Sequence, residues 1–149
     1  MQINFFKKMA KPGTVILVED DIDDKRFFED TLKEIGLNYD IAWFETTYDA
    51  LEFLRTTKKP IFLIFSDINL PGKNGLEFKR TIDEDPKLRK KSIPFVFYST
   101  SAYQQDVNEA YTKMTVQGFF KKGNDLTETA HTLKLIFDYW TLCKHPNAR

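Results

Sequence analysis

The sequence predicts an α/β fold in which five parallel strands alternate with helices. Short runs of consecutive apolar residues recur along the chain, a pattern typical of strands that are buried on both faces of a sheet. Between these runs, apolar residues repeat every three or four positions, as they do on the buried face of a helix. Because crossovers between parallel strands are helical and right-handed, helices should cover both faces of the sheet and produce three layers.

The predicted strands are short segments bounded by turn residues or polar residues. The third is the most distinct, since five apolar residues, 61–65, are followed by Ser66, Asp67 and a Pro-Gly turn. The first strand follows another Pro-Gly pair and ends in Glu-Asp-Asp. In chain order, the strands are expected at residues 14–18, 39–44, 61–66, 95–98 and 117–122.

A helix is expected after each strand. In the first helix, Phe28, Leu32 and Ile35 share one face, and Gly36 provides a C-terminal stop. The second is expected to be capped by Thr46 or Thr47 and to bury residues 50, 51 and 54. The helices are expected from residue 21 to the stop at residue 36, after residue 46 or 47, from about residue 74, and at 104–114 and 126–142.

Two segments are predicted to lack stable regular structure. Residues 83–92 are highly charged and contain Pro86, so they are expected to form a loop or a frayed helix end. The tail, residues 145–149, is expected to be frayed. His131 and His145 are both expected to lie at the surface without a functional role.

Length and composition predict one soluble domain over residues 1–149. The 22 basic and 22 acidic residues cancel, which gives no electrostatic footprint for nucleic acid. No apolar run approaches the roughly 20 residues that a membrane-spanning helix needs, and residues 1–10 lack the apolar core of a signal peptide. Cys143 is the only cysteine, so an internal disulfide is excluded and a cytoplasmic location is expected.

Polar side chains follow four of the predicted strands, at the point where each strand ends. Glu19 and Asp20 follow the first strand, Asp67 the third, Ser99 the fourth, and Lys122 the fifth. Because parallel strands end at the same edge of a sheet, these groups should converge there. That edge is where open α/β sheets bind their ligands.

Carboxylates crowded at this edge would repel one another and raise each other's pKa values. Lys122 supplies one compensating positive charge, and a divalent cation would supply the rest. Mg²⁺ prefers oxygen ligands and keeps several of its waters, so one or two carboxylates and a backbone carbonyl are enough to hold it. The sequence therefore predicts a magnesium site built around Asp67.

At these positions the chain resembles the receiver domain of two-component response regulators. The similarity is carried by four motifs in the expected order, and it covers about residues 13–142. It implies a flavodoxin-like (βα)5 sandwich with sheet order 2-1-3-4-5, an order that the receiver fold illustrates. The motifs are Val-Glu-Asp-Asp at 18–21, Ser-Asp-Ile-Asn-Leu-Pro-Gly-Lys-Asn-Gly at 66–75, Ser-Thr-Ser at 99–101 and Gly-Phe-Phe-Lys-Lys-Gly at 118–123.

The resemblance implies that Asp67 accepts a phosphoryl group from a histidine kinase or a histidine phosphotransfer protein. It also implies that Asp20 is the main Mg²⁺ carboxylate, that Glu19 assists it, and that Asn69 offers its backbone carbonyl. Two alternatives in register stay open. Asp21 could replace Asp20 at the metal, and Lys121 could replace Lys122 at the phosphoryl group.

The switch residues implied by the resemblance are Ser99, which would bond a phosphoryl oxygen, and Phe119 on the fifth strand. Phe119 stands where many members carry a tyrosine or a phenylalanine, and it lacks the hydroxyl of tyrosine. A second departure is Gly123, because the family usually has proline after the active-site lysine, often with a cis bond. A non-proline cis bond is costly, which favours a trans bond between Lys122 and Gly123, but the sequence alone does not fix the isomer.

The predicted function is a single-domain response regulator that signals through a change of its surface rather than acting as an enzyme. Output is expected through the face formed by residues 103–140, with the protein a monomer or a phosphorylation-dependent dimer. One alternative is an aspartate-nucleophile phosphohydrolase, but those enzymes want a second acid two residues after the nucleophile, where this chain has Asn69. Another is a degenerate receiver that acts as a binding module without phosphate.

Overall fold

The structure is a computed structural model that describes residues 13–146. Its five strands form one parallel sheet in the order β2-β1-β3-β4-β5, as the resemblance implied. The N-terminal extension up to residue 12 and residues 147–149 lie outside the described part. The strands are β1 Thr14–Val18, β2 Asp40–Phe44, β3 Ile61–Ser66, β4 Phe95–Ser99 and β5 Gly118–Lys121.

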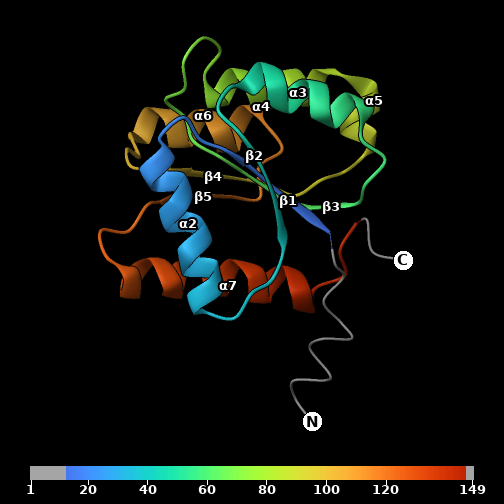
Figure 1. Ribbon diagram of the computed structural model, residues 1–149. Helices are drawn as coiled ribbons and strands as arrows, with labels where there is room; N and C mark the ends of the chain where they lie inside the picture. Colours follow the sequence, from blue (N-terminus) through green and yellow to red (C-terminus); the bar gives the residue numbers. More distant parts are fainter. Residues whose placement is uncertain (1–12, 147–149) are drawn as a thin grey trace.

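Helices cover both faces of the sheet, which confirms the predicted three layers (Figure 1). The two helices α2 and α7 pack side by side on one face, and the other four lie on the opposite face. The helices are α2 Ile22–Glu34, α3 Thr47–Thr56, α4 Gly75–Glu84, α5 Pro86–Lys90, α6 Gln104–Lys113 and α7 Leu126–Leu142. No helix in residues 13–146 is long and apolar enough to cross a membrane.

The sheet is buried on both faces because its strands alternate between two apolar clusters. In β1, Ile16 and Val18 pack under α3 and α4, whereas Val15 and Leu17 pack against α2 and α7. Every residue of β1 and β3 is buried. This burial fixes the register of the two central strands and therefore the positions of the residues that follow them.

Local capping explains where the helices begin. The Asp21 carboxylate accepts hydrogen bonds from two backbone N–H groups of the first turn of α2, and Thr46, rather than Thr47, caps α3. Asn74 and Glu77 form a capping box at the start of α4. Each such cap stabilises its helix by about 1 kcal/mol.

The expectation that residues 83–92 lack a regular helix of their own is wrong, because they contain the short helix α5. Pro86 occupies its first turn, where a missing N–H costs nothing. The carboxylate of Asp85 caps α5 by accepting hydrogen bonds from two of its backbone N–H groups, and Leu88 is buried beneath it. The proline that suggested a helix end therefore begins a new helix.

The expectation that His145 lies at the surface in a frayed tail is also wrong. Its ring is buried, stacks on Phe62 with centroids 5.0 Å apart, and places Nε2 2.6 Å from the Phe62 carbonyl oxygen. Trp140 packs edge-on against the same imidazole. These contacts hold the segment after α7 against the start of β3. His131, in contrast, is exposed as expected.

The buried position of His145 predicts a pH-dependent stability. Burial lowers the pKa of His145 below its ordinary 6.5, so the folded protein favours the neutral imidazole. The corresponding stabilisation is present above pH 6.5 and is lost as the pH falls below 6.5 toward the folded-state pKa. We expect thermal unfolding to show a larger drop in Tm between pH 7.5 and 5.5 for the wild type than for His145→Gln, which cannot titrate. Parallel pH profiles for the two proteins would contradict this account.

Candidate functional site

The two central strands set the positions of Glu19 and Asp67. Strands β1 and β3 are parallel neighbours in which Val18 pairs with Ser66, so the next residues emerge together. The ladder continues past the strand ends, because the Asp67 N–H donates to the Val18 carbonyl at 3.0 Å. The Glu19 N–H similarly donates to the Phe44 carbonyl of β2 at 3.0 Å. Both backbones are therefore held by the sheet, not by a flexible loop.

Three carboxylates gather at this edge, as the sequence predicted. Glu19, Asp20 and Asp67 each present a carboxylate oxygen, and these atoms lie within 4.8 Å of one another. Glu19 is 3% exposed and Asp67 8% exposed, whereas Asp20 faces solvent. A cluster of hard oxygen donors open to water on one side fits a divalent cation such as Mg²⁺. The role of each residue at a metal remains a prediction.

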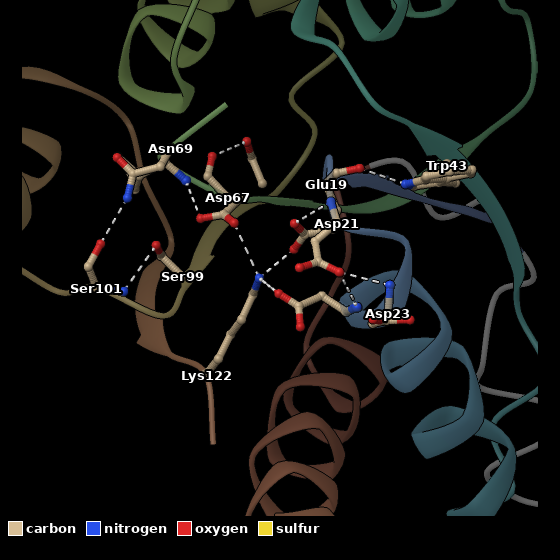
Figure 2. A network of polar contacts seen from close by, with 12 residues as sticks. Glu19, Asp21, Asp23, Trp43, Asp67, Asn69, Ser99, Ser101 and Lys122 are labelled. Atoms are coloured by element: carbon tan, nitrogen blue, oxygen red, sulfur yellow. Dashed lines mark hydrogen bonds and ion pairs between the residues drawn. The ribbon is translucent and has the colours of Figure 1, made fainter. Parts of the chain in front are cut away.

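The ammonium of Lys122 lies between the carboxylates (Figure 2). Its Nζ is 3.2 Å from Asp67 Oδ2, 3.0 Å from Asp24 Oδ2, and in hydrogen-bond contact with Glu19. The Lys122 N–H donates to the Ser99 carbonyl at 2.8 Å, so the lysine backbone is tied to the end of β4. Lys121 is exposed. The geometry thus favours Lys122 over Lys121.

Burial and mutual contact shift the ionisation of this group. Burial raises the pKa of Glu19 to about 7, against the lowering effect of Lys122, and the nearby charge of Asp67 adds to the rise. Burial alone would lower the pKa of Lys122, but Glu19, Asp67 and Asp24 outweigh it and hold that pKa above its ordinary value. The ammonium therefore stays charged at neutral pH, while burial disfavours the charged form of Glu19.

Asp67 is held in one orientation by its neighbours. Its Oδ1 accepts a hydrogen bond from the Ile68 N–H at 2.7 Å, which leaves Oδ2 for Lys122. Gly75, the first residue of α4, lies directly against this turn, since a Cβ there would be 2.1 Å from the Asp67 carbonyl oxygen. This requirement for glycine was not predicted. In the sequence, Gly75 is recognisable only as a turn residue before a helix.

Ser99, Asn69 and Ser101 form the other side of the site (Figure 2). The Asn69 amide donates to the Ser101 hydroxyl at 3.0 Å, and the Ser101 N–H donates to the Ser99 hydroxyl at 3.4 Å. Ser99 is fully buried at the end of β4. The contact of Asn69 in the structure is through its side chain, so a metal contact through its carbonyl stays a prediction.

Asp21 lies in the helix cap rather than in the acidic cluster, which favours Asp20 in the alternative that the sequence left open. Two site neighbours were missed. One is Asp24, which pairs with Lys122, and the other is Trp43, whose indole N–H donates to the Glu19 carbonyl at 2.7 Å. From the sequence, Asp24 is only an acidic residue in the first turn of a helix, where the helix dipole favours negative charge.

The two predicted departures from the family pattern have simple structural consequences. The peptide bond between Lys122 and Gly123 is trans, as expected. Phe119 is half-buried, and its ring centroid lies 5.5 Å from that of Phe97. Phe119 therefore extends the aromatic core of the α3–α6 face.

Comparisons with known proteins agree with this geometry. Response regulator Rcp1 of Synechocystis sp. is 28% identical over 135 residues, which cover 87% of this chain and 89% of that protein. The crystal structure of the Mn²⁺-bound form of Rcp1 has a TM-score of 0.77 and 26% identity over 91% of this chain and 99% of that chain. The phosphorylated cyanobacterial phytochrome response regulator RcpA has a TM-score of 0.78 and 26% identity over the same shares of the two chains.

The family model of the response regulator receiver domain matches residues 15–134. This range contains β1 from its second residue, the other four strands, the acidic cluster and Lys122. The chain thus belongs to the response regulator receiver family, whose members are signalling proteins rather than classical enzymes.

Proposed function

We propose that this chain is a single receiver domain that accepts a phosphoryl group on Asp67 in a Mg²⁺-dependent reaction. The observation that carries the proposal is the position of the Asp67 carboxylate, which contacts the Lys122 ammonium and lies within 4.8 Å of two further carboxylates. The phosphodonor is a histidine kinase or a histidine phosphotransfer protein, as is general for this family. The location that fits such a donor is the cytoplasm.

In the transfer, an oxygen of Asp67 forms a bond to phosphorus as the bond from phosphorus to the donor's imidazole nitrogen breaks. Oδ1 already accepts the Ile68 N–H, so the oxygen that faces Lys122, Oδ2, is the nucleophile. Lys122 compensates charge on the phosphoryl oxygens, and the Ser99 hydroxyl donates to another of them. The remaining role of the protein is to position the reacting groups.

Glu19 and Asp20 would hold Mg²⁺ together with Asp67, and the backbone carbonyl of Asn69 completes the protein ligands in this proposal. When bound, Mg²⁺ supplies charge neutralisation for the incoming phosphoryl group. The carboxylate donors in the structure suit this ion, and the Mn²⁺-bound form of Rcp1 supports a divalent cation here. Because metal ligands are deprotonated, any proton on Glu19 would pass to water if the cation binds, since Lys122 is already protonated.

Two other functions are less well supported. A phosphohydrolase would need an acid at Asn69, but that side chain is an amide engaged with Ser101. A degenerate receiver would not need to keep buried carboxylates around a lysine, which is costly unless the charges are used.

Because RcpA is a phytochrome response regulator, a phytochrome-type kinase is a sensible first donor to test for this chain. The protein is a monomer or a phosphorylation-dependent dimer.

Phosphorylation of Asp67 is tested by intact mass. Incubation with acetyl phosphate and Mg²⁺ should add one phosphoryl group, which hydroxylamine should remove because it is an acyl phosphate. Asp67→Asn should gain no mass, while its far-UV circular dichroism stays unchanged because the substitution is nearly isosteric. If the Asn variant gains the same labile mass, the phosphoacceptor is another residue.

The metal site is tested by thermal unfolding and by Trp43 fluorescence, since Trp43 contacts the backbone of Glu19. Saturation with Mg²⁺ at about 100 times Kd should raise the free energy of unfolding by about 2.7 kcal/mol. Asp20→Asn should lower Mg²⁺ affinity by roughly tenfold or more, because ligand charge sets affinity at oxygen-donor sites. Asp23→Asn removes an exposed carboxylate in the nearby first turn of α2, so it is the matched control and should bind Mg²⁺ nearly as the wild type does. A Tm that does not respond to Mg²⁺ would count against the site.

The output surface is expected at α6, β5 and α7. Tyr103 and Tyr111 on and beside α6 are 69% and 53% exposed, and they leave aromatic area open for a partner. Beryllofluoride, a phosphoryl mimic, should shift backbone NMR resonances of residues 103–122 as Ser99 and Phe119 change position. Phe119 has no hydroxyl to exchange between partners, so its two positions should differ by packing alone. Shifts confined to the loops around Asp67 would refute this output face.

A further inference from the structure

Lys122 has a third carboxylate partner outside the acidic cluster that gathers around Asp67. Asp24 Oδ2 lies 3.0 Å from Lys122 Nζ, closer than Asp67 Oδ2 at 3.2 Å. Asp24 comes from the first turn of α2, whereas Glu19 and Asp67 follow strands. The ammonium is thus pulled toward α2 by one carboxylate and toward the sheet edge by two.

The fold leaves the Asp24 carboxylate free for this contact. Asp24 occupies the third position of α2, where an acidic side chain ordinarily reaches back to the backbone N–H of the capping residue. Here Glu19 Oε2 accepts that N–H of Asp21 at 3.2 Å instead. The Asp24 side chain is also 39% exposed, so it can move away from Lys122 into water at little cost.

We propose that Asp24 is a positioning residue that competes with the phosphoryl group of Asp67 for Lys122. This inference rests on the proposed phosphorylation of Asp67. Before phosphorylation, Asp24 accepts one of the hydrogen bonds that the Lys122 ammonium donates. After phosphorylation, a phosphoryl oxygen accepts that hydrogen bond instead, and Asp24 is released toward solvent. Asp24 therefore sets how much free energy the contact with the phosphoryl group must supply before Lys122 moves from Asp24 to the phosphoryl oxygen.

The negative charge of Asp24 acts in the same direction as its competition for Lys122. Four carboxylates, those of Glu19, Asp20, Asp24 and Asp67, surround or flank a single ammonium. Asp24 favours an incoming Mg²⁺ by its charge and by drawing Lys122 away from the metal carboxylates. The same charge disfavours an anionic phosphoryl group. Loss of Asp24 should thus weaken Mg²⁺ binding and strengthen binding of the phosphoryl mimic.

The opposite signs of these two effects make the experiment decisive. Asp24→Asn and Asp24→Ala are compared with the wild type in a Trp140→Phe background, in which Trp43 is the only indole and reports on the site. Mg²⁺ affinity is measured first, and beryllofluoride affinity is then measured at saturating Mg²⁺. Asp23→Asn is the matched control, since it removes a charge from the same helical turn without touching the ion pairs of Lys122.

For both Asp24 variants, we expect Mg²⁺ affinity to fall by roughly two- to fivefold and beryllofluoride affinity to rise by a similar factor, as suits a partly exposed ion pair. Asp23→Asn should change either affinity by less than the Asp24 variants do. A loss of both affinities would show that Asp24 merely supports the structure or supports Lys122 in the phosphorylated state, and it would overturn the proposal. Equal effects of Asp23→Asn and Asp24→Asn would show that general charge repulsion, not the contact between Asp24 and Lys122, changes the affinities. That result would also overturn the proposal.

Failure of the proposed function would look different. In that case the wild type would bind no beryllofluoride, or its fluorescence response to the mimic would persist unchanged in Asp67→Asn. The Mg²⁺ measurement needs no phosphoryl mimic, so it still tests the pull of Asp24 on Lys122. Unchanged Mg²⁺ affinity in both Asp24 variants would reject that pull by itself.

Discussion

The contact between the Lys122 ammonium and the carboxylates at the ends of β1 and β3 is the interaction on which the site depends. Lys122 follows β5, at the edge of the sheet, and β4 lies between β5 and β3. The side chain must therefore cross the end of β4 to reach Asp67 and Glu19. Its backbone hydrogen bond to Ser99 fixes the point from which it crosses. The sheet order, with β1 and β3 in the centre, makes the convergence possible.

This arrangement is not a device for stability. Removing charged groups from water costs several kcal/mol per ion, and ion pairs in such positions often return no more than they cost. Glu19, with its pKa raised to about 7 by burial, carries this cost directly. The apolar strands behind the site supply the stabilisation that tolerates it, since every side chain of β1 and β3 is buried. The Lys122 ammonium is therefore shared among competing carboxylates, and an added cation or anion can change which of them it contacts.

Features set by a single segment of sequence could be predicted, and features set by distant segments could not. The five strands were predicted because uninterrupted apolar runs such as residues 61–65 admit few other structures. Convergence of the strand-end residues followed from the parallel sheet alone. The contacts of Asp24 with Lys122 and of His145 with Phe62 join residues 98 and 83 positions apart, and neither has a local signature. Helix α5 was missed for a different reason, because Pro86 is compatible with both the end and the start of a helix.

Under the proposed function, phosphoryl chemistry at Asp67 would reach the surface because the residues proposed to sense it also belong to the packing of β4 and β5. Ser99 is the last residue of β4 and pairs with Lys121, the residue directly before Lys122. Two residues earlier on each strand, Phe97 pairs with Phe119, and their rings are in contact. A shift of the Ser99 hydroxyl and the Lys122 ammonium toward one new anion pulls on both strands at their common end. Because a close-packed interior has few intermediate arrangements, Phe97 and Phe119 must repack together. In this proposal, the aromatic pair would convert a change in hydrogen bonding at the sheet edge into a change of the surface formed by α6 and β5.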